Sequence, residues 1–177
     1  MPELPETETI ARDLDAALRG VRLGLATVIR PDVLRGERDA AAFAARSEGA
    51  TVTRVWRRAK LVVVELSNAL RLAVQPRFTG ALLIHKGAFL GDEFTCIVWP
   101  LSDGRTLTYR DVRRLGTVAL LNDAQWSAYE RALGVEPLGE VFTADSLSGI
   151  LRSSRQAVKA VLMDQRRIAG IGNIYAT

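Results

Sequence analysis

The sequence is poor in cysteine and histidine, because its 177 residues contain one of each, Cys96 and His85. A single cysteine excludes a disulfide within the chain, as expected for a protein of the reducing cytoplasm. Two such residues cannot supply the four Cys or His ligands of a structural zinc site. We therefore expect no metal site and no cofactor in these residues.

Long apolar runs are also absent. No stretch approaches the roughly 20 residues that a membrane-spanning helix needs, and no signal peptide is recognisable. The sequence contains no internal repeat and no low-complexity segment. These absences predict a soluble protein of the cytoplasm with no membrane partner.

The residues that are present suit an ordinary globular protein. Hydrophobic residues make up 48% and charged residues 25% of the chain, enough for one domain or one domain with part of another. The net charge is +4 and the sequence pI is about 9.7. This basic excess favours a polyanionic partner, although other soluble proteins carry a similar charge.

The first 50 residues alternate between helical and extended patterns. Apolar residues recur at helical spacing over residues 6–19, and Gly20 is a typical C-terminal stop. Residues 21–29 predict a strand that ends before Pro31. The alanine-rich stretch 38–46 predicts a short helix.

Between residues 51 and 121 the pattern changes to short segments rich in Val, Leu and Thr. The predicted strands are 51–56, 61–66, 70–74, 80–84, 94–99, 106–109 and 117–121. Turn signals separate them, and Asp103-Gly104 is typical of a two-residue hairpin turn. Short strands at this spacing, without long parallel connections, indicate a β-sandwich or barrel.

Helical periodicity returns after residue 121. The predicted helices are 122–133, 143–151 and 156–163, followed by one that opens at 170–173. The chain ends inside that last helix, and one helical turn is not stable alone in water. We therefore predict an α+β protein, with an N-terminal β-sandwich domain over 1–134 with flanking helices and part of a helical domain over 135–177.

The N-terminus carries a pair of residues suited to chemistry. Removal of Met1 gives Pro2 a free secondary amine, and an α-amino group with a pKa of roughly 7.7–8 is partly neutral at pH 7. A neutral amine attacks a sugar C1′ or an aldehyde, and a secondary amine then gives an iminium that cannot lose an N–H proton. Glu3 is placed for proton transfer. The alternative is an ordinary helix start, in which Glu6 and Glu8 complement the helix dipole.

The opening PELPETET, with Pro2, Glu3 and Glu6 in register, resembles the formamidopyrimidine-DNA glycosylase family (Fpg/Nei) of base-excision repair enzymes. The PELPE form is similar to the Fpg branch rather than to the endonuclease VIII branch. The resemblance implies that Pro2 is the nucleophile and that Glu3 moves protons at the sugar.

A second segment, Arg57-Arg58-Ala59-Lys60, precedes a hydrophobic strand and resembles the family's RR-x-K motif. In the family this lysine contacts DNA at the lesion, so the resemblance implies that Lys60 belongs to the catalytic group. The alternative is a basic residue on an edge strand, where charge prevents aggregation.

The third segment, Arg77-Phe78-Thr79-Gly80, resembles a family loop whose methionine wedges into the hole left by an everted base. Phe78 holds the methionine position here, and an aromatic ring can also stack on bases. The alternative is a buried phenylalanine in a β-turn.

Residues 111–117 read DVRRLGT and resemble the family's DPRRFG loop. The resemblance implies that Arg113 pairs with the base opposite the lesion, since an arginine fork suits the acceptors of an orphaned cytosine. Val112 replaces the family's proline. Leu115 replaces a stacking phenylalanine and can still serve as an apolar wedge. The alternative is a solvated basic turn.

The last segments, residues 159–165 and 169–176, resemble the family's helix–two-turn–helix signature, K-x-x-L-[LM]-D-[QN]…G-[IV]-G-N-I-Y-A. Glycines let backbone N–H groups approach a phosphate at the start of a helix. The resemblance implies that Lys159 and Asn173 hold a DNA phosphate. The alternative is that the glycines only permit close helix packing.

Three departures accompany the resemblance. The zinc-ribbon hairpin that follows the helical domain in the family, and holds its structural zinc, is not in these residues. Gln75 replaces a family histidine, and residues 92–96 lack the histidines expected there. These departures leave the preferred lesion and the preferred opposite base open.

The resemblance runs over residues 1–177 and implies a monomeric, bifunctional DNA glycosylase and AP lyase of the bacterial nucleoid. Its implied partner is double-stranded DNA that contains oxidised purines or abasic sites. Two alternatives remain open: a DNA-binding relative without lyase activity, because a retained Met1 makes the Pro2 nitrogen an amide, and an inactive fragment of a longer enzyme.

Overall fold

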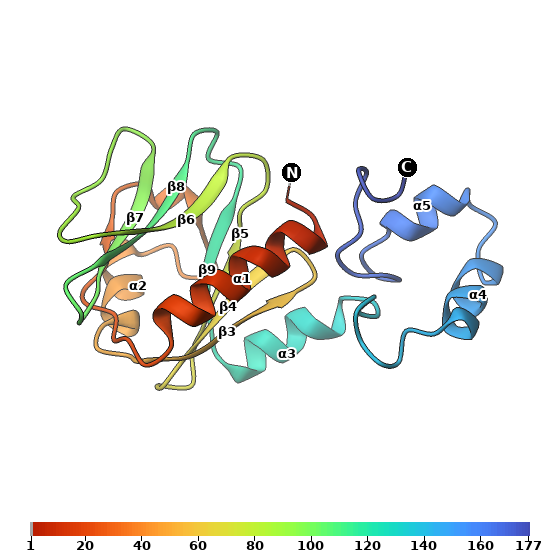
Figure 1. The fold of residues 1–177 in the computed structure, drawn as a ribbon, viewed down its shortest axis with the longest axis horizontal. Coiled ribbons are helices and arrows are strands. Elements are labelled where there is room, and N and C mark those ends of the chain that lie inside the picture. Colours follow the sequence, from red (N-terminus) through yellow and green to blue (C-terminus); the bar gives the residue numbers. More distant parts are fainter. Residues whose placement is uncertain (1) are drawn as a thin grey trace.

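The computed structural model describes residues 2–177. Two β-sheets pack face to face, and a smaller helical lobe, residues 135–177 with helices α4 and α5, lies beside them (Figure 1). The four-stranded sheet has the order β1-β7-β8-β6, and the five-stranded sheet has the order β2-β9-β5-β4-β3. The predicted α+β class with a β-sandwich is therefore confirmed. None of the helices in the described part is long and apolar enough to span a membrane.

The elements have the following bounds. The helices are α1 (Leu4–Leu18), the 3-10 turn η1 (Pro31–Val33), α2 (Ala40–Ser47), α3 (Asp123–Arg131), α4 (Ala144–Arg152) and α5 (Val158–Met163). The strands are β1 (Thr27–Val28), β2 (Leu34–Arg35), β3 (Val52–Arg58), β4 (Leu61–Leu66), β5 (Arg71–Gln75), β6 (Gly80–His85), β7 (Thr95–Pro100), β8 (Thr106–Asp111) and β9 (Thr117–Leu121).

The core lies between the two sheets. Trp99 and Tyr109 point inward from the four-stranded sheet and are fully buried, as is Leu72 from the five-stranded sheet. The ring of Phe43, from α2, packs against Trp99 with the ring centroids 6.3 Å apart. Each such side chain contributes about 1.5–3 kcal/mol through burial, which makes the sandwich a rigid support for its loops.

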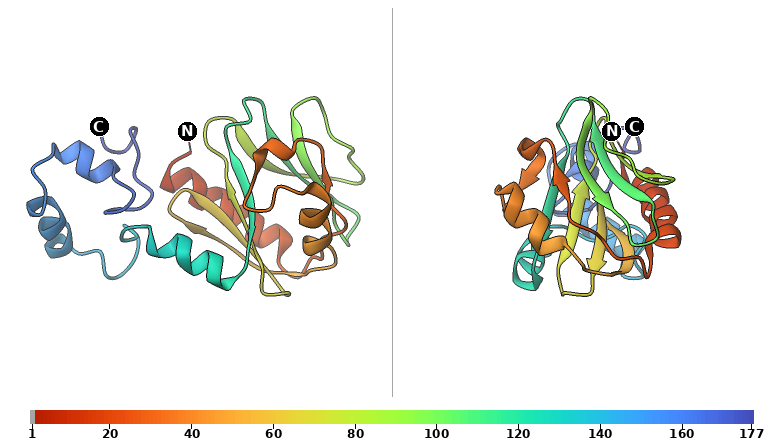
Figure 2. Two further views of the ribbon diagram at one scale, coloured as in Figure 1. Left: turned by 180° about the vertical axis from the view of Figure 1, so that it is seen from behind. Right: turned by 90° about the vertical axis from the view of Figure 1, so that its left-hand side faces the viewer.

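Helix α1 closes one side of the sandwich. It buries Ala11, Leu14 and Leu18 along one face, and Asp15 Oδ1 accepts a hydrogen bond of 2.6 Å from the backbone N–H of Val55 on the edge strand β3. The helix therefore covers that edge, and its N-terminus lies between the sandwich and the helical lobe (Figure 2).

Local sequence signals place most elements correctly. The hairpin turn between β7 and β8 lies at Asp103-Gly104, with Gly104 at φ 84° in the left-handed region that suits glycine. Asp39 caps α2 by accepting N–H groups from Ala41 and Ala42. The turn and this helix are therefore confirmed.

The strand predicted over 21–29 is wrong except at Thr27–Val28. Arg22 bridges Thr51, beside the five-stranded sheet, whereas Leu23 bridges Leu101, beside the four-stranded sheet. This segment crosses between the sheets and so cannot keep one hydrogen-bond ladder. The helix expected to open at 170–173 is present only as a single turn over residues 173–176, in which Ala176 N–H donates to Gly172 O at 3.1 Å.

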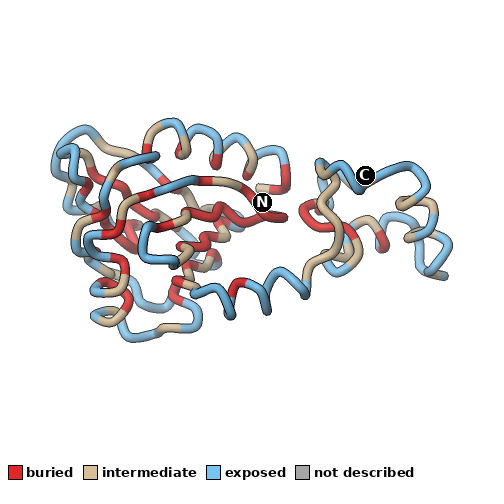
Figure 3. Tube along the Cα trace, turned by 90° about the horizontal axis from the view of Figure 1, so that it is seen from below, coloured by how far each residue is buried: buried red, intermediate tan, exposed pale blue. Residues whose placement is uncertain are grey.

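The helical lobe is thinly packed. Its buried side chains are few, notably Val161, Ile168 and Ala169, and many of its other residues are exposed (Figure 3). Backbone hydrogen bonds join the segment that enters the lobe to its C-terminal part: the N–H groups of Gly134 and Val135 donate to the carbonyls of Gln165 and Arg167. These bonds bring residues 165–175 back against the start of α1.

Candidate active site

The Glu3 carboxylate sits in a ring of backbone N–H groups. It is 2% exposed and accepts hydrogen bonds from the N–H groups of Gly172 (2.6 Å), Ile174 (2.8 Å) and Tyr175 (3.4 Å). These donors belong to the 172–175 turn, where the resemblance places a phosphate-binding helix start. N–H groups of this kind can bind a phosphate, but here they donate to the Glu3 carboxylate.

Two further contacts fix the N-terminus against this turn. Leu4 N–H donates to Gly170 O at 3.0 Å, and the Tyr175 hydroxyl donates to Glu6 Oε1 at 2.7 Å. The hydrogen bond from Tyr175 is the main reason why the pKa of Glu6 lies below its usual value. Pro2, which precedes the N-cap residue Glu3 of α1, is partly exposed. The sequence motifs gave no sign of the Glu6–Tyr175 contact.

Lys60 lies beside Glu3. A methyl group built on Gly172 would be 2.5 Å from Glu3 Cδ and 2.6 Å from Lys60 Nζ, so both side chains converge on one glycine. Burial, partly offset by the Glu3 charge, lowers the pKa of Lys60. A lysine in this state releases its proton more readily than a solvated one. The structure thus brings the three residues predicted to be catalytic to one place.

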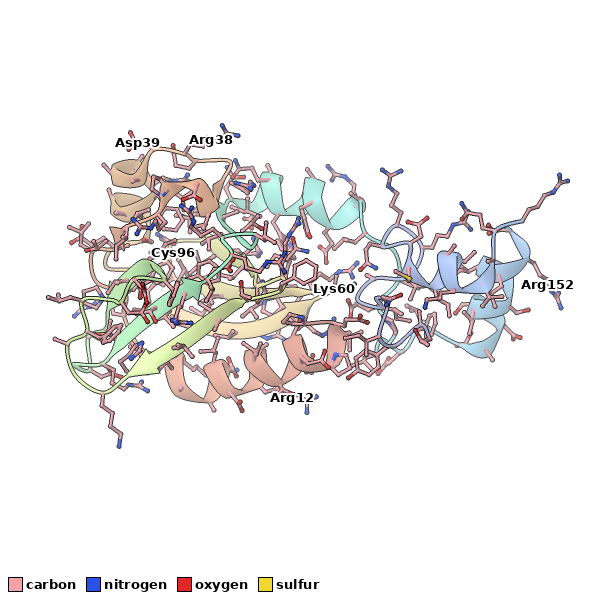
Figure 4. The ribbon with its side chains drawn as sticks, turned by 90° about the horizontal axis from the view of Figure 1, so that it is seen from above. Arg12, Arg38, Asp39, Lys60, Cys96 and Arg152 are labelled. Atoms are coloured by element: carbon pink, nitrogen blue, oxygen red, sulfur yellow. The ribbon has the colours of Figure 1, made fainter. Side chains whose placement is uncertain are left out.

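A cavity of about 320 Å³ opens next to this group. It is lined by Ala59, Lys60, Gln75, Arg77, Tyr129, Leu133 and Gln165. Figure 4 shows Lys60 at the end of the sandwich that faces the helical lobe, whereas Arg12 lies on the outer side of α1. Gln75, at the position where the resemblance leads us to expect a histidine, is one of these lining residues.

Phe78 and Arg113 form a pair on the surface. The Phe78 side chain is 54% exposed, so the alternative of a buried turn residue is wrong. The Arg113 guanidinium carbon lies 5.0 Å from the centroid of the Phe78 ring. Leu115, in the same loop as Arg113, is 39% exposed. These side chains are available to contact a large ligand.

Lys159 and Asn173 meet through Thr177. Lys159 Nζ contacts Thr177 Oγ1 at 2.8 Å, and this hydroxyl donates to the Asn173 carbonyl at 2.7 Å. All three residues are exposed. The pair predicted to hold a phosphate is thus close together, and no contact joins it directly to the Phe78–Arg113 pair.

A cluster of four charged residues, Glu8, Arg57, Arg58 and Glu136, ties the sandwich to the helical lobe. The Arg57 side chain is 4% exposed and pairs with both Glu8 and Glu136. Glu136 also accepts from Arg58 Nη1 at 2.9 Å and from the backbone N–H of Ala59 at 2.8 Å. Arg57 and Arg58 are therefore held in ion pairs and are not solvated side chains on an edge strand. Because Glu136 also binds the Ala59 N–H, the cluster fixes the turn that carries Lys60.

We expect Glu136→Gln to lower the free energy of unfolding by about 2–3 kcal/mol at pH 7, because Arg57 loses a charged partner in a buried position. Burial would raise the pKa of Glu136, but hydrogen bonds from Arg57 and Ala59 and the charges of both arginines outweigh it, so this pKa is lowered.

The sign of the pH dependence follows from this shift. A carboxyl whose folded-state pKa lies below its ordinary value of 4.5 stabilises the fold fully above that value, and less as the pH falls through the folded-state pKa. Urea unfolding should show the deficit of Glu136→Gln at neutral pH, shrinking in acid. Glu140→Gln, at an exposed position, is the control; an equal deficit for both variants would contradict the assignment.

Comparison with known proteins decides the family. Residues 1–118 match the family described as "Formamidopyrimidine-DNA glycosylase N-terminal domain", and residues 133–177 match the "Formamidopyrimidine-DNA glycosylase H2TH domain". The chain belongs to the formamidopyrimidine-DNA glycosylase family. The resemblance inferred from the sequence motifs is therefore confirmed, including the helix–two-turn–helix domain.

Individual members of the formamidopyrimidine-DNA glycosylase family agree. The chain is 40% identical to the enzyme of Moorella thermoacetica over 99% of its own length and 65% of the relative, and 38% identical to that of Chloroflexus aurantiacus over 99% and 63%. The solved structure of the Lactococcus lactis enzyme bound to DNA with an abasic site superposes with a TM-score of 0.88 at 27% identity, covering 98% of this chain and 66% of that one. The chain thus spans about two thirds of the length of its relatives.

The structural zinc expected for the family has no donors here. Within residues 2–177, no three His, Cys, Asp or Glu side chains lie close enough together to hold a metal ion. Residues 92–96, where family histidines were expected, instead place Asp92 in an ion pair of 2.9 Å with Arg110, and this hydrogen bond lowers the pKa of Asp92 to about 2.

Proposed function

We propose that this chain is the catalytic part of a bifunctional DNA glycosylase and AP lyase that removes oxidised purines, such as 8-oxoguanine and formamidopyrimidines, from double-stranded DNA. The observation that carries the proposal is the convergence of Glu3, the residue that follows Pro2, and of Lys60 on Gly172. The names of the relatives and their DNA complexes support the substrate class. The setting we propose is base-excision repair on the bacterial nucleoid.

The first step is base removal. The damaged nucleotide is everted from the stack, since a base inside a duplex cannot be reached. The Pro2 nitrogen forms a bond to C1′ while the glycosidic bond breaks, and the electron pair of that bond leaves with the base, which takes up a proton. The attacking amine then loses its own proton. Glu3, the adjacent carboxyl, is placed to accept or return these protons.

The second step is strand cleavage. The nitrogen electron pair forms an iminium as the C1′–O4′ bond breaks, and O4′ takes a proton. Loss of a C2′ proton breaks the C3′–O bond and expels the 3′ phosphate. Loss of a C4′ proton then breaks the C5′–O bond and expels the 5′ phosphate, and water hydrolyses the remaining iminium to free Pro2. Lys60 contacts the DNA at the lesion, and Lys159 and Asn173 hold a phosphate. Phe78, Arg113 and Leu115 fill the space that the everted nucleotide leaves.

The test is reductive trapping. The chain with Met1 removed is mixed with a duplex that contains one abasic site, and borohydride reduces any iminium to a stable amine. We expect a covalent protein–DNA adduct, resolved on a denaturing gel, and none with the undamaged duplex. Absence of an adduct from chain that begins at Pro2 would refute the proposal.

The second candidate is a non-catalytic, lesion-binding relative or an inactive fragment of a longer enzyme. One observation favours it: the chain spans about two thirds of the length of its relatives. Intact-mass measurement separates the cases, because a mass that includes Met1 leaves the Pro2 nitrogen as an unreactive amide. Binding to abasic duplex without any adduct would then support this candidate.

A further inference from the structure

Two loops meet at one edge of the sandwich. The β5–β6 turn, residues 76–79, runs from the five-stranded sheet to the four-stranded sheet, and the β8–β9 loop, residues 112–116, runs back. Between them lies the side chain of Asp111, the last residue of β8, which is 1% exposed. The loops carry Phe78 and Arg113.

The Asp111 carboxylate accepts four hydrogen bonds. Oδ1 accepts from the Thr79 hydroxyl and from the Arg113 N–H at 3.2 Å. Oδ2 accepts from the Gly116 N–H at 2.8 Å and from the Tyr109 hydroxyl at 3.2 Å. Burial would raise the pKa of Asp111, but the hydrogen bonds outweigh it and the pKa lies below its usual value. One charged group thus joins both loops.

Thr79 is the link between the loops. Its hydroxyl donates to Asp111 and at the same time accepts the Arg113 N–H at 3.0 Å. Each loop also holds a non-glycine residue in the left-handed region, Arg77 at φ 53° and Arg114 at φ 52°. Such conformations persist only when surrounding contacts fix them, and these hydrogen bonds are contacts of that kind.

We propose that Thr79 and Asp111 are positioning residues that lock the two loops together, so that the Phe78 ring and the Arg113 guanidinium form one stacking platform before DNA binds. This inference rests on the proposed function, because it assigns the platform to the base opposite the lesion. A preformed platform loses less conformational freedom on binding than two independent loops. The two side chains already contact each other, because the Arg113 guanidinium carbon lies 5.0 Å from the centroid of the Phe78 ring.

The test uses Thr79 rather than Asp111, because removing the buried charge can unfold the protein. Thr79→Val keeps the shape but loses the hydroxyl, Thr79→Ser restores it, and Thr117→Val removes a hydroxyl nearby that makes no hydrogen bond within the described residues. The probe is a duplex with tetrahydrofuran, a stable abasic analogue, opposite 2-aminopurine, whose fluorescence reports stacking.

We expect Thr79→Val to raise the dissociation constant about tenfold, the scale of one lost hydrogen bond to a charged group. The fluorescence change at saturating protein should also shrink, which a merely less stable but folded protein would not cause. Thr79→Ser should restore both readings, and Thr117→Val should match the unsubstituted chain.

Several outcomes would overturn the inference. These are unchanged affinity and amplitude for Thr79→Val, failure of Thr79→Ser to restore them, and no binding of the duplex by the unsubstituted chain. Reductive trapping separates this result from the proposed function. An adduct with no effect of Thr79→Val overturns only the positioning role, whereas binding that depends on Thr79 without any adduct overturns only the catalysis.

Discussion

Gly172→Ala is expected to reduce base excision and adduct formation by about a hundredfold while leaving the fold intact, the scale set by a displacement of about 1 Å in a catalytic group. The added methyl group would lie 2.5 Å from Glu3 Cδ and 2.6 Å from Lys60 Nζ, well inside van der Waals contact. Both are the far ends of flexible side chains, so they move and the backbone stays.

The size of this effect follows from how Glu3 is held. Its carboxylate cannot move away from a new methyl group without losing hydrogen bonds from Gly172, Ile174 and Tyr175. The displaced carboxylate would no longer be fixed beside Pro2. Single-turnover excision of an 8-oxoguanine duplex at saturating protein measures the loss, and circular dichroism verifies the fold.

Gly149→Ala is the matched control. Gly149 lies in α4, and beyond its chain neighbours and the backbone of the helix itself no atom lies within 4 Å of the position that a methyl group would take. Alanine favours a helix by roughly 0.5–1 kcal/mol over glycine, so this variant should be at least as stable and fully active. If Gly172→Ala kept the activity of Gly149→Ala, the convergence of Glu3 and Lys60 would not be needed for the chemistry.

An N-terminal extension is expected to abolish the trapped adduct. Any residue before Pro2 turns its nitrogen into an amide, which is not a nucleophile, so the yield should fall by more than about a hundredfold. Chain with retained Met1 should behave in the same way. The same extension at the C-terminus is the control. An adduct from the extended protein would instead point to Lys60, whose lowered pKa makes it the alternative amine.

Pro2→Gly should weaken the adduct rather than abolish it. Glycine keeps a free α-amino group, but its imine can lose the N–H proton that an iminium from proline lacks. Adduct formation by both proteins should rise with pH through about 7.7–8, where an α-amino group loses its proton. Trapping yields between pH 6 and pH 9 measure this, and a flat profile would exclude an α-amine as the nucleophile.

Local patterns in the sequence were enough to predict much of the secondary structure and the family. Periodicity and caps located α2 and the strands between residues 51 and 121, and Asp103-Gly104 located a hairpin turn. Ordered motifs from Pro2 to Asn173 identified the formamidopyrimidine-DNA glycosylase family. These signals are readable because turn chemistry and side-chain alternation act between residues a few positions apart.

Contacts between groups that lie far apart in the sequence could be seen only in the folded chain. The bond from Gly172 N–H to Glu3 joins residues 169 positions apart, and Arg57 meets Glu136 across 79 positions. The same holds for the Thr79–Asp111 link and for residues 21–29, whose pairing changes from one sheet to the other. No local pattern specifies such partners, because they depend on how the sheets, α1 and the helical lobe pack together.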